Sequence, residues 1–132
     1  MNYKEIRWKQ RFGDFENSLD NLRRALTIEE PDDVYRAGII QFFEVTFELA
    51  WKTLKDFLEA SGYVVWNPRE TIQLAFKDGI IANGHEWIDA LEKRNLMTHT
   101  YNEDLSREAE KLIRDKYVFI LEQMYNQLKN EK

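Results

Sequence analysis

The chain has 132 residues and a mass of 15.9 kDa, with 43% hydrophobic residues, 33% charged residues and no cysteine. A sequence without cysteine excludes disulfides, thiolate–zinc sites, iron–sulfur clusters and cysteine nucleophiles. The formal net charge of −5 argues against broad, sequence-independent binding of nucleic acid backbones.

The length is that of one domain, and we expect residues 1–132 to form it. Charged residues are scattered through the first twelve positions, and no apolar run of membrane-spanning length follows them. We therefore expect a soluble, cytoplasmic protein with no membrane segment.

The spacing of apolar residues predicts an all-α protein. The first segment carries one apolar stripe, with members three and four residues apart: Trp8, Phe12, Phe15, Leu19, Leu22 and Leu26. Pro31, followed by Asp32 and Asp33, indicates a turn and the start of a second long helix, because acidic residues favour the positive end of the helix dipole. This helix is expected to end near Ser61-Gly62.

The second helix is apolar on two sides. One side is a seam of residues alternating three and four apart: Ile40, Phe43, Phe47, Ala50, Leu54 and Phe57. The other side has a separate set: Tyr35, Ile39, Phe42 and Leu49. Two apolar sides need two neighbours, so this helix is either the central helix of a bundle or a dimer surface.

Three further helices are expected after it. Asn67-Pro68-Arg69-Glu70 reads as N-cap, N1 proline and N3 glutamate of a short helix closed by Asp78-Gly79, and Asn83-Gly84-His85-Glu86 repeats the capping pattern. A polar turn over 98–104 precedes a long helix, 105–128, with one apolar face: Ile113, Tyr117, Ile120, Met124 and Leu128. The sequence thus predicts an up-and-down bundle of four to five helices, three long and two short.

Residues whose side chains could bind a substrate or transfer a proton concentrate between Arg94 and Tyr101. A guanidinium, an amide, an imidazole and a phenol lie there within eight residues. Arg94 offers a planar fork for a phosphate, and His99 can exchange protons near pH 7. Five residues span about 140° on an ideal helix, so either the helix ends between these two residues or a partner group comes from a second chain. The plainer alternative is a salt-bridged arginine and a histidine that caps a helix. We expect His85, the other histidine, to be a surface or capping residue.

A second polar group is the ladder Glu44, Glu48 and Lys52. It is either a salt-bridged helix edge or a set of carboxylates lining a site that holds Arg94. A di-metal carboxylate bundle needs Glu-x-x-His pairs, which the sequence lacks, so we expect no metal site and no cofactor. The sequence also has no glycine-rich phosphate loop, which argues against nucleotide transfer by this chain alone.

The motif Arg94-x4-His99-x-Tyr101 resembles the R-x4-H-x-Y signature of the HepT-type branch of the HEPN families, also described as nucleotidyltransferase substrate-binding proteins. Similarity extends over most of the chain: Phe43-Glu44, Phe47 to Lys52, Pro68-Arg69, Trp87, and Arg94-Asn95 to Tyr101. The resemblance implies a homodimeric helical bundle whose motifs meet across the two-fold axis. It also implies a separately encoded minimal nucleotidyltransferase as partner in a toxin–antitoxin pair.

By this resemblance Arg94 and His99 are the residues of a metal-independent ribonuclease, supported by Asn95. Tyr101 is the residue to which the partner attaches AMP, which silences the toxin. The net charge of +1 over 92–102 favours a single-stranded or tRNA-like end over a long duplex as substrate. The alternative is a subunit that binds a nucleotide or other substrate for the transferase and cuts nothing, with Trp51, Trp66 and Trp87 as candidate stacking surfaces for a base.

Overall fold

A computed structural model describes residues 2–98 and 102–132, and all regular secondary structure within these ranges is helical. The helices in chain order are α1 (Tyr3–Ala25), α2 (Asp33–Ala60), α3 (Pro68–Lys77), α4 (Gly84–Thr98), α5 (Glu103–Leu112), the π-helical turn η1 (Ile113–Tyr117) and α6 (Val118–Lys129). Because α5, η1 and α6 follow one another without a break, they form one long C-terminal helix. The predicted all-α bundle, with three long and two short helices, is confirmed.

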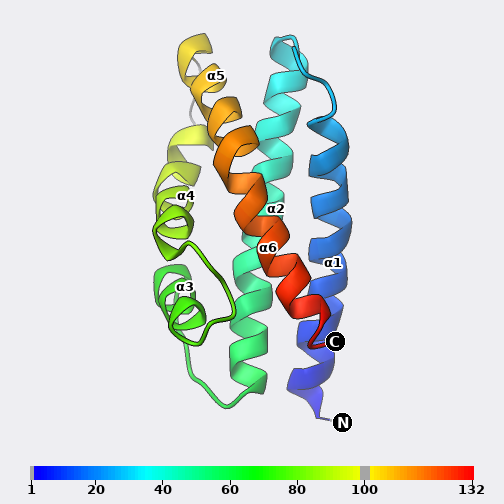
Figure 1. Ribbon diagram of the computed structural model, residues 1–132, viewed down its shortest axis with the longest axis vertical. Helices are drawn as coiled ribbons and strands as arrows, with labels where there is room; N and C mark the ends of the chain where they lie inside the picture. Colours follow the sequence, from blue (N-terminus) through cyan, green and yellow to red (C-terminus); the bar gives the residue numbers. More distant parts are fainter. Residues whose placement is uncertain (1, 99–101) are drawn as a thin grey trace.

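Helix α2 is the centre of the bundle (Figure 1). It packs against α1, α3, α4 and α5, while the C-terminal helix crosses obliquely so that α6 reaches α1. Helices α3 and α4 follow one another along the far side of α2 from α1. Of the two alternatives predicted for the helix with two apolar sides, the structure shows the central position in the bundle, while a role as dimer surface stays a prediction. Among the residues described, no helix is long and apolar enough to cross a membrane.

Most helix ends lie where local signals predict them. Asp32 caps α2 by accepting a hydrogen bond from the Tyr35 amide at 2.9 Å, and Asn67 caps α3 by accepting one from the Glu70 amide at 2.8 Å. Gly62 and Gly79 follow the ends of α2 and α3 with φ of 98° and 77°, the left-handed conformation that glycine adopts without a steric penalty.

The start of α4 differs from the predicted capping pattern. Asn83 has a φ of 58°, whereas an N-cap residue is extended, and its carbonyl accepts the amides of Glu86 and Trp87. Gly84 then packs so closely on Phe76 that a Cβ at this position would lie 2.9 Å from the ring. A tertiary contact with α3, which the sequence does not reveal, therefore shapes this turn.

The buried core follows the predicted stripes. All but Leu26 of the first stripe are at most 1% exposed, and so are Phe43, Phe47 and Leu54 of the α2 seam. The predicted face of the C-terminal helix is buried over its full length, although that helix begins at Glu103 rather than at residue 105.

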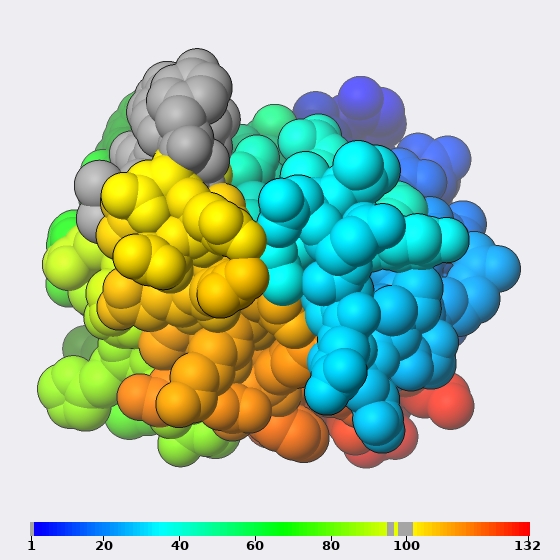
Figure 2. Space-filling model, turned by 90° about the horizontal axis from the view of Figure 1, so that it is seen from above, coloured from blue at the N-terminus to red at the C-terminus, as the bar shows by residue number. Residues whose placement is uncertain are grey.

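An ion-pair network ties the C-terminal helix to the connection between α1 and α2. Glu110 accepts hydrogen bonds from Arg36 at 2.9 Å and from Arg114 at 2.7 Å, while Arg114 also donates to the carbonyls of Leu26 and Ile28. Burial alone raises the pKa of Glu110, but the bonds from the two arginines outweigh it, so this pKa lies below its ordinary value. Figure 2 looks onto this end, where the start of α2 lies beside α5.

Candidate functional site

The structure brings Arg94 of α4 together with Glu48 of α2. One guanidinium nitrogen of Arg94 donates a hydrogen bond to Glu48 Oε2 at 3.0 Å, and Lys52 Nζ lies 3.5 Å from Glu48 Oε1. Glu48 thus contacts two cations, one from its own helix and one from α4. The salt-bridged helix edge is therefore present, and Glu48 contacts Arg94; that Glu44 and Glu48 line a functional site stays a prediction.

This cluster lies at the surface. The side chains of Arg94, Glu48 and Lys52 are 26%, 44% and 40% exposed. Exposed ion pairs of this kind contribute about 0–1 kcal/mol to stability, so the fold does not depend on this one. A phosphate oxygen can therefore replace the carboxylate as acceptor for Arg94 at little cost. Glu44, half-buried, lies one helical turn before Glu48 on α2.

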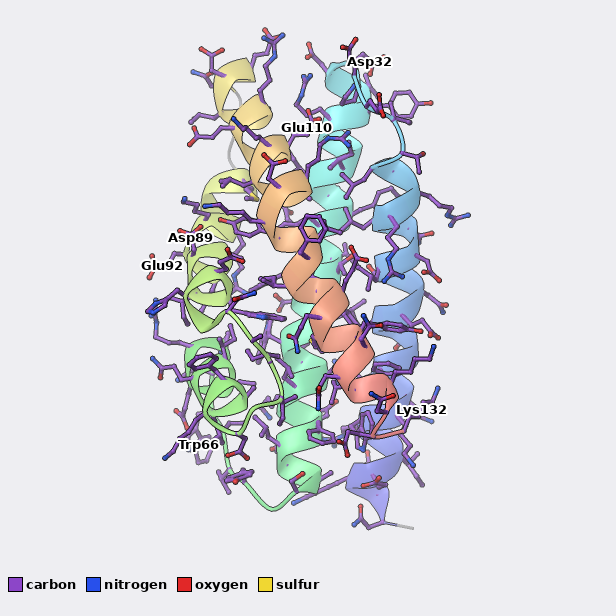
Figure 3. The ribbon with its side chains drawn as sticks, viewed as in Figure 1. Asp32, Trp66, Asp89, Glu92, Glu110 and Lys132 are labelled. Atoms are coloured by element: carbon purple, nitrogen blue, oxygen red, sulfur yellow. The ribbon has the colours of Figure 1, made fainter. Side chains whose placement is uncertain are left out.

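Helix α4 is fixed to the bundle by apolar and polar contacts. Trp87 is fully buried, and its ring lies 5.6 Å from that of Phe47 on α2. Glu92, labelled on α4 in Figure 3, accepts a hydrogen bond from Arg69 of α3 at 2.9 Å. Arg94 is therefore presented by an anchored helix, which restricts where its guanidinium can lie.

Three of the predicted site residues cannot be placed as side chains. His99 and Tyr101 lie outside the described residues, and Asn95 lies in α4 with its side chain outside the described part. Helix α4 extends to Thr98, the residue directly before His99, so Arg94 lies within the helix. The position of Arg94 relative to His99 stays a prediction.

The other candidate side chains differ in how far they are buried. Trp87 is a core residue, so the proposal that it stacks on a base is wrong. Trp51 is half-buried, and Trp66 is 78% exposed on the connection before α3, well below Asp89 and Glu92 in Figure 3. His85 is exposed in the first turn of α4, about 13 Å along the helix from Arg94.

The described residues contain no group of three or more His, Cys, Asp or Glu placed to hold a metal ion.

Sequence comparison relates the chain to a protein family and to a probable ribonuclease. The model of the family "Nucleotidyltransferase substrate binding protein like" matches residues 10–130. The probable ribonuclease HepT of Haemophilus influenzae is 27% identical over 100 residues, which cover 70% of this chain and 68% of that protein.

Two solved structures share the fold. A protein from Thermus thermophilus superposes with a TM-score of 0.80 and 33% identity over 86% of this chain and 98% of that one. A Haemophilus influenzae protein, described as having the fold of a substrate binding domain of a nucleotidyltransferase, has a TM-score of 0.70 and 22% identity over 92% and 96%. The two structures show the fold, and the family match over 10–130 gives the assignment: the chain belongs to the nucleotidyltransferase substrate-binding protein family.

Proposed function

We propose that this chain is the ribonuclease subunit of a two-component module whose other member is a minimal nucleotidyltransferase, in the manner of HEPN toxin–antitoxin pairs. The observation that carries the proposal is Arg94, the first residue of the R-x4-H-x-Y motif, held at the surface by Glu48 at 3.0 Å. Similarity to the probable ribonuclease HepT supports the same reaction.

The proposed reaction is internal transesterification of RNA. His99 takes the proton of a 2′-hydroxyl, the 2′-oxygen attacks the adjacent phosphorus, and the bond from phosphorus to the 5′-oxygen breaks. The 5′-oxygen takes a proton from solvent, to which His99 returns its own. The products are a 2′,3′-cyclic phosphate and a 5′-hydroxyl. Arg94 stabilises the negative charge that develops on the phosphorane. Glu48 orients Arg94, while Glu44 and Asn95 support substrate binding, and none of these roles uses a metal ion.

The active form is proposed to be a homodimer. Large apolar residues lie exposed along one face of α2: Val34 (80%), Tyr35 (55%), Phe42 (39%) and Val45 (42%). Val45 is three residues before Glu48, so this apolar stripe adjoins the polar cluster. A second copy packed on the stripe by two-fold symmetry would bring both Arg94 side chains to one cleft, where His99 of one protomer can serve Arg94 of the other.

Charge placed in the apolar stripe is expected to break the dimer. Sedimentation should give wild type a molar mass of twice 15.9 kDa and Val45→Glu a molar mass of 15.9 kDa. The reason is that a carboxylate buried at the interface would have no partner. Val64→Glu is the matched control, since Val64 is 67% exposed but lies after α2, off the stripe. Analytical ultracentrifugation decides: a monomeric wild type, or a dimer of Val45→Glu, contradicts the proposed interface.

Silencing is proposed to occur at Tyr101. Its phenolic oxygen would attack the α-phosphorus of ATP bound to the partner transferase, and pyrophosphate would leave. The phosphate placed two residues from His99 would occupy the cleft and repel an RNA phosphate. A nucleotidyltransferase partner agrees with the family to which the chain belongs. Both proteins are proposed to act in the cytoplasm.

The second candidate function is a non-catalytic subunit that binds a substrate or nucleotide for the transferase. The family description and the Haemophilus influenzae substrate-binding fold favour it. Incubation of the purified chain with a tRNA pool in EDTA distinguishes the two. Fragments ending in a 2′,3′-cyclic phosphate support the ribonuclease, and RNA that stays intact while bound supports the binding subunit.

A further inference from the structure

A buried tyrosine links the C-terminal helix to α4. Tyr117, the last residue of the π turn η1, is fully buried, and its hydroxyl donates a hydrogen bond to Asp89 Oδ2 on α4. Its ring stacks on Phe43 of α2, with centroids 5.4 Å apart and planes inclined by 23°. One side chain therefore contacts both helices of the candidate site, α2 and α4.

The bond joins a neutral donor to a charged acceptor. Burial, reinforced by the hydrogen bond to Asp89, raises the pKa of Tyr117, so the phenol keeps its proton. Burial also acts to raise the pKa of Asp89, but the bonds from Tyr117 and Lys93 outweigh it, and this pKa lies below its ordinary value. Lys93 Nζ is 3.2 Å from Asp89 Oδ1, so both carboxylate oxygens have partners. Hydrogen bonds to a charged partner are the stronger kind.

The π turn aligns Tyr117 for this contact. Ala109, Ile113 and Tyr117 are buried four residues apart, and in an α-helix each such step rotates the side chain by about 40°. Over two steps Tyr117 would turn away from the face that Ala109 presents. A π turn takes in an extra residue, since its bonds run from i to i+5, and this returns Tyr117 to the buried face. Such turns often occur at functional sites.

The rotation of α4 about its axis decides where Arg94 points. On one side Asp89 binds Tyr117, and on another Arg94 binds Glu48 through an exposed ion pair, which is the weaker restraint. Loss of the Asp89 bond would leave the helix held by its buried side chains, Trp87, Ala90, Leu91 and Met97, and by the Arg69–Glu92 pair. A catalytic group displaced by about 1 Å can lose roughly 100-fold in rate.

We infer that Asp89 and Tyr117 are positioning residues that fix the rotation of α4 and so aim Arg94. The inference rests on the proposed function, in which Arg94 acts on an RNA phosphate. Neither residue is proposed to contact the substrate. Their effect on cleavage is exerted through the direction of the Arg94 guanidinium.

The chain offers a matched control for the loss of this hydroxyl. Tyr125, on α6 of the same long helix, donates its hydroxyl to Glu16 on α1 and stacks on Phe12 with centroids 5.4 Å apart. Tyr117→Phe and Tyr125→Phe each remove one tyrosine–carboxylate bond and keep a stacked ring. Only the first removes a contact with α4.

Hydrogen exchange of the α4 amides and steady-state cleavage of RNA measure the difference. For Tyr117→Phe we expect exchange over Gly84–Thr98 to rise about tenfold, the effect of losing one bond to a charged group. We expect kcat to fall about tenfold and KM to change less than twofold, because Arg94 acts mainly in the transition state. Tyr125→Phe should change neither α4 exchange nor kcat. Equal effects of the two variants would overturn the inference.

Variants of the acceptor provide a second test. Asp89→Asn keeps an oxygen for the Tyr117 hydroxyl and should retain slow exchange in α4, whereas Asp89→Ala should lose it. If Asp89→Ala exchanges and cleaves like wild type, the positioning role is wrong. A wild-type chain that cleaves no RNA would refute the proposed ribonuclease, and the exchange data would still decide the role of the pair.

Discussion

Arg94→Ala is expected to lower RNA cleavage by about 100- to 1,000-fold, the usual loss when a group that stabilises transition-state charge is removed. Its partner Glu48 is 44% exposed, so the fold should lose about 1 kcal/mol or less. Arg94→Lys should recover part of the rate, because lysine keeps the charge but not the planar fork. Single-turnover cleavage and thermal unfolding of each variant give the two quantities.

Arg69 provides the control for this substitution. It too forms an exposed ion pair with a glutamate, Glu92, at 2.9 Å, and this pair joins α3 to α4. Arg69→Ala therefore removes a comparable contact that anchors α4 but keeps Arg94 and Glu48, so its cleavage rate should fall far less than that of Arg94→Ala. A similar loss in both variants would mean that Arg94 acts only as a structural ion pair.

Phe47→Ala is expected to reduce the free energy of unfolding by about 3–5 kcal/mol. Phe47 is fully buried, and its ring lies 5.7 Å from Phe43 and 5.6 Å from Trp87. The substitution opens a cavity between α2 and α4, the two helices that carry Glu48 and Arg94. Urea unfolding followed by circular dichroism measures the change.

Phe119→Ala is the matched substitution at the surface. Phe119 is 60% exposed on α6, so its loss should cost less than about 1 kcal/mol. If the two alanine variants were equally stable, the core between α2 and α4 would not be packed as described.

Local signals allowed the helix ends to be predicted from sequence. Asp32 and Asn67 cap the helices that follow them, and Gly62 and Gly79 end α2 and α3, because each signal acts within a few residues. The burial of the stripes on α1 and on the C-terminal helix followed from periodicity, whereas Tyr35 and Phe42 of the second apolar set on α2 are 55% and 39% exposed.

Contacts between distant segments could not be predicted in this way. The spacing of Glu44, Glu48 and Lys52 suggested a helical ion pair, but only the fold shows that Glu48 also reaches Arg94, 46 residues away. The π turn and the Asp89–Tyr117 bond were missed as well. The available signal was a tyrosine on a buried face, since a buried hydroxyl needs a hydrogen-bond partner.

The roles of His99 and Tyr101 rest on the motif. Their place in the sequence, five and seven residues after Arg94, matches the R-x4-H-x-Y pattern, and both lie outside the described residues. The contact between Arg94 and Glu48 supports the proposed place of Arg94 in the site. The proposed roles of His99 and Tyr101 come from the motif alone.

The most direct measurement is cleavage of a tRNA pool in EDTA by the wild-type chain and by His99→Ala. Loss of the proton-transfer group should lower the rate by about 100- to 10,000-fold while the dimer persists. This result would establish a metal-independent ribonuclease and assign His99. Equal cleavage by both proteins, or intact tRNA with both, would contradict the proposed ribonuclease and leave a substrate-binding subunit.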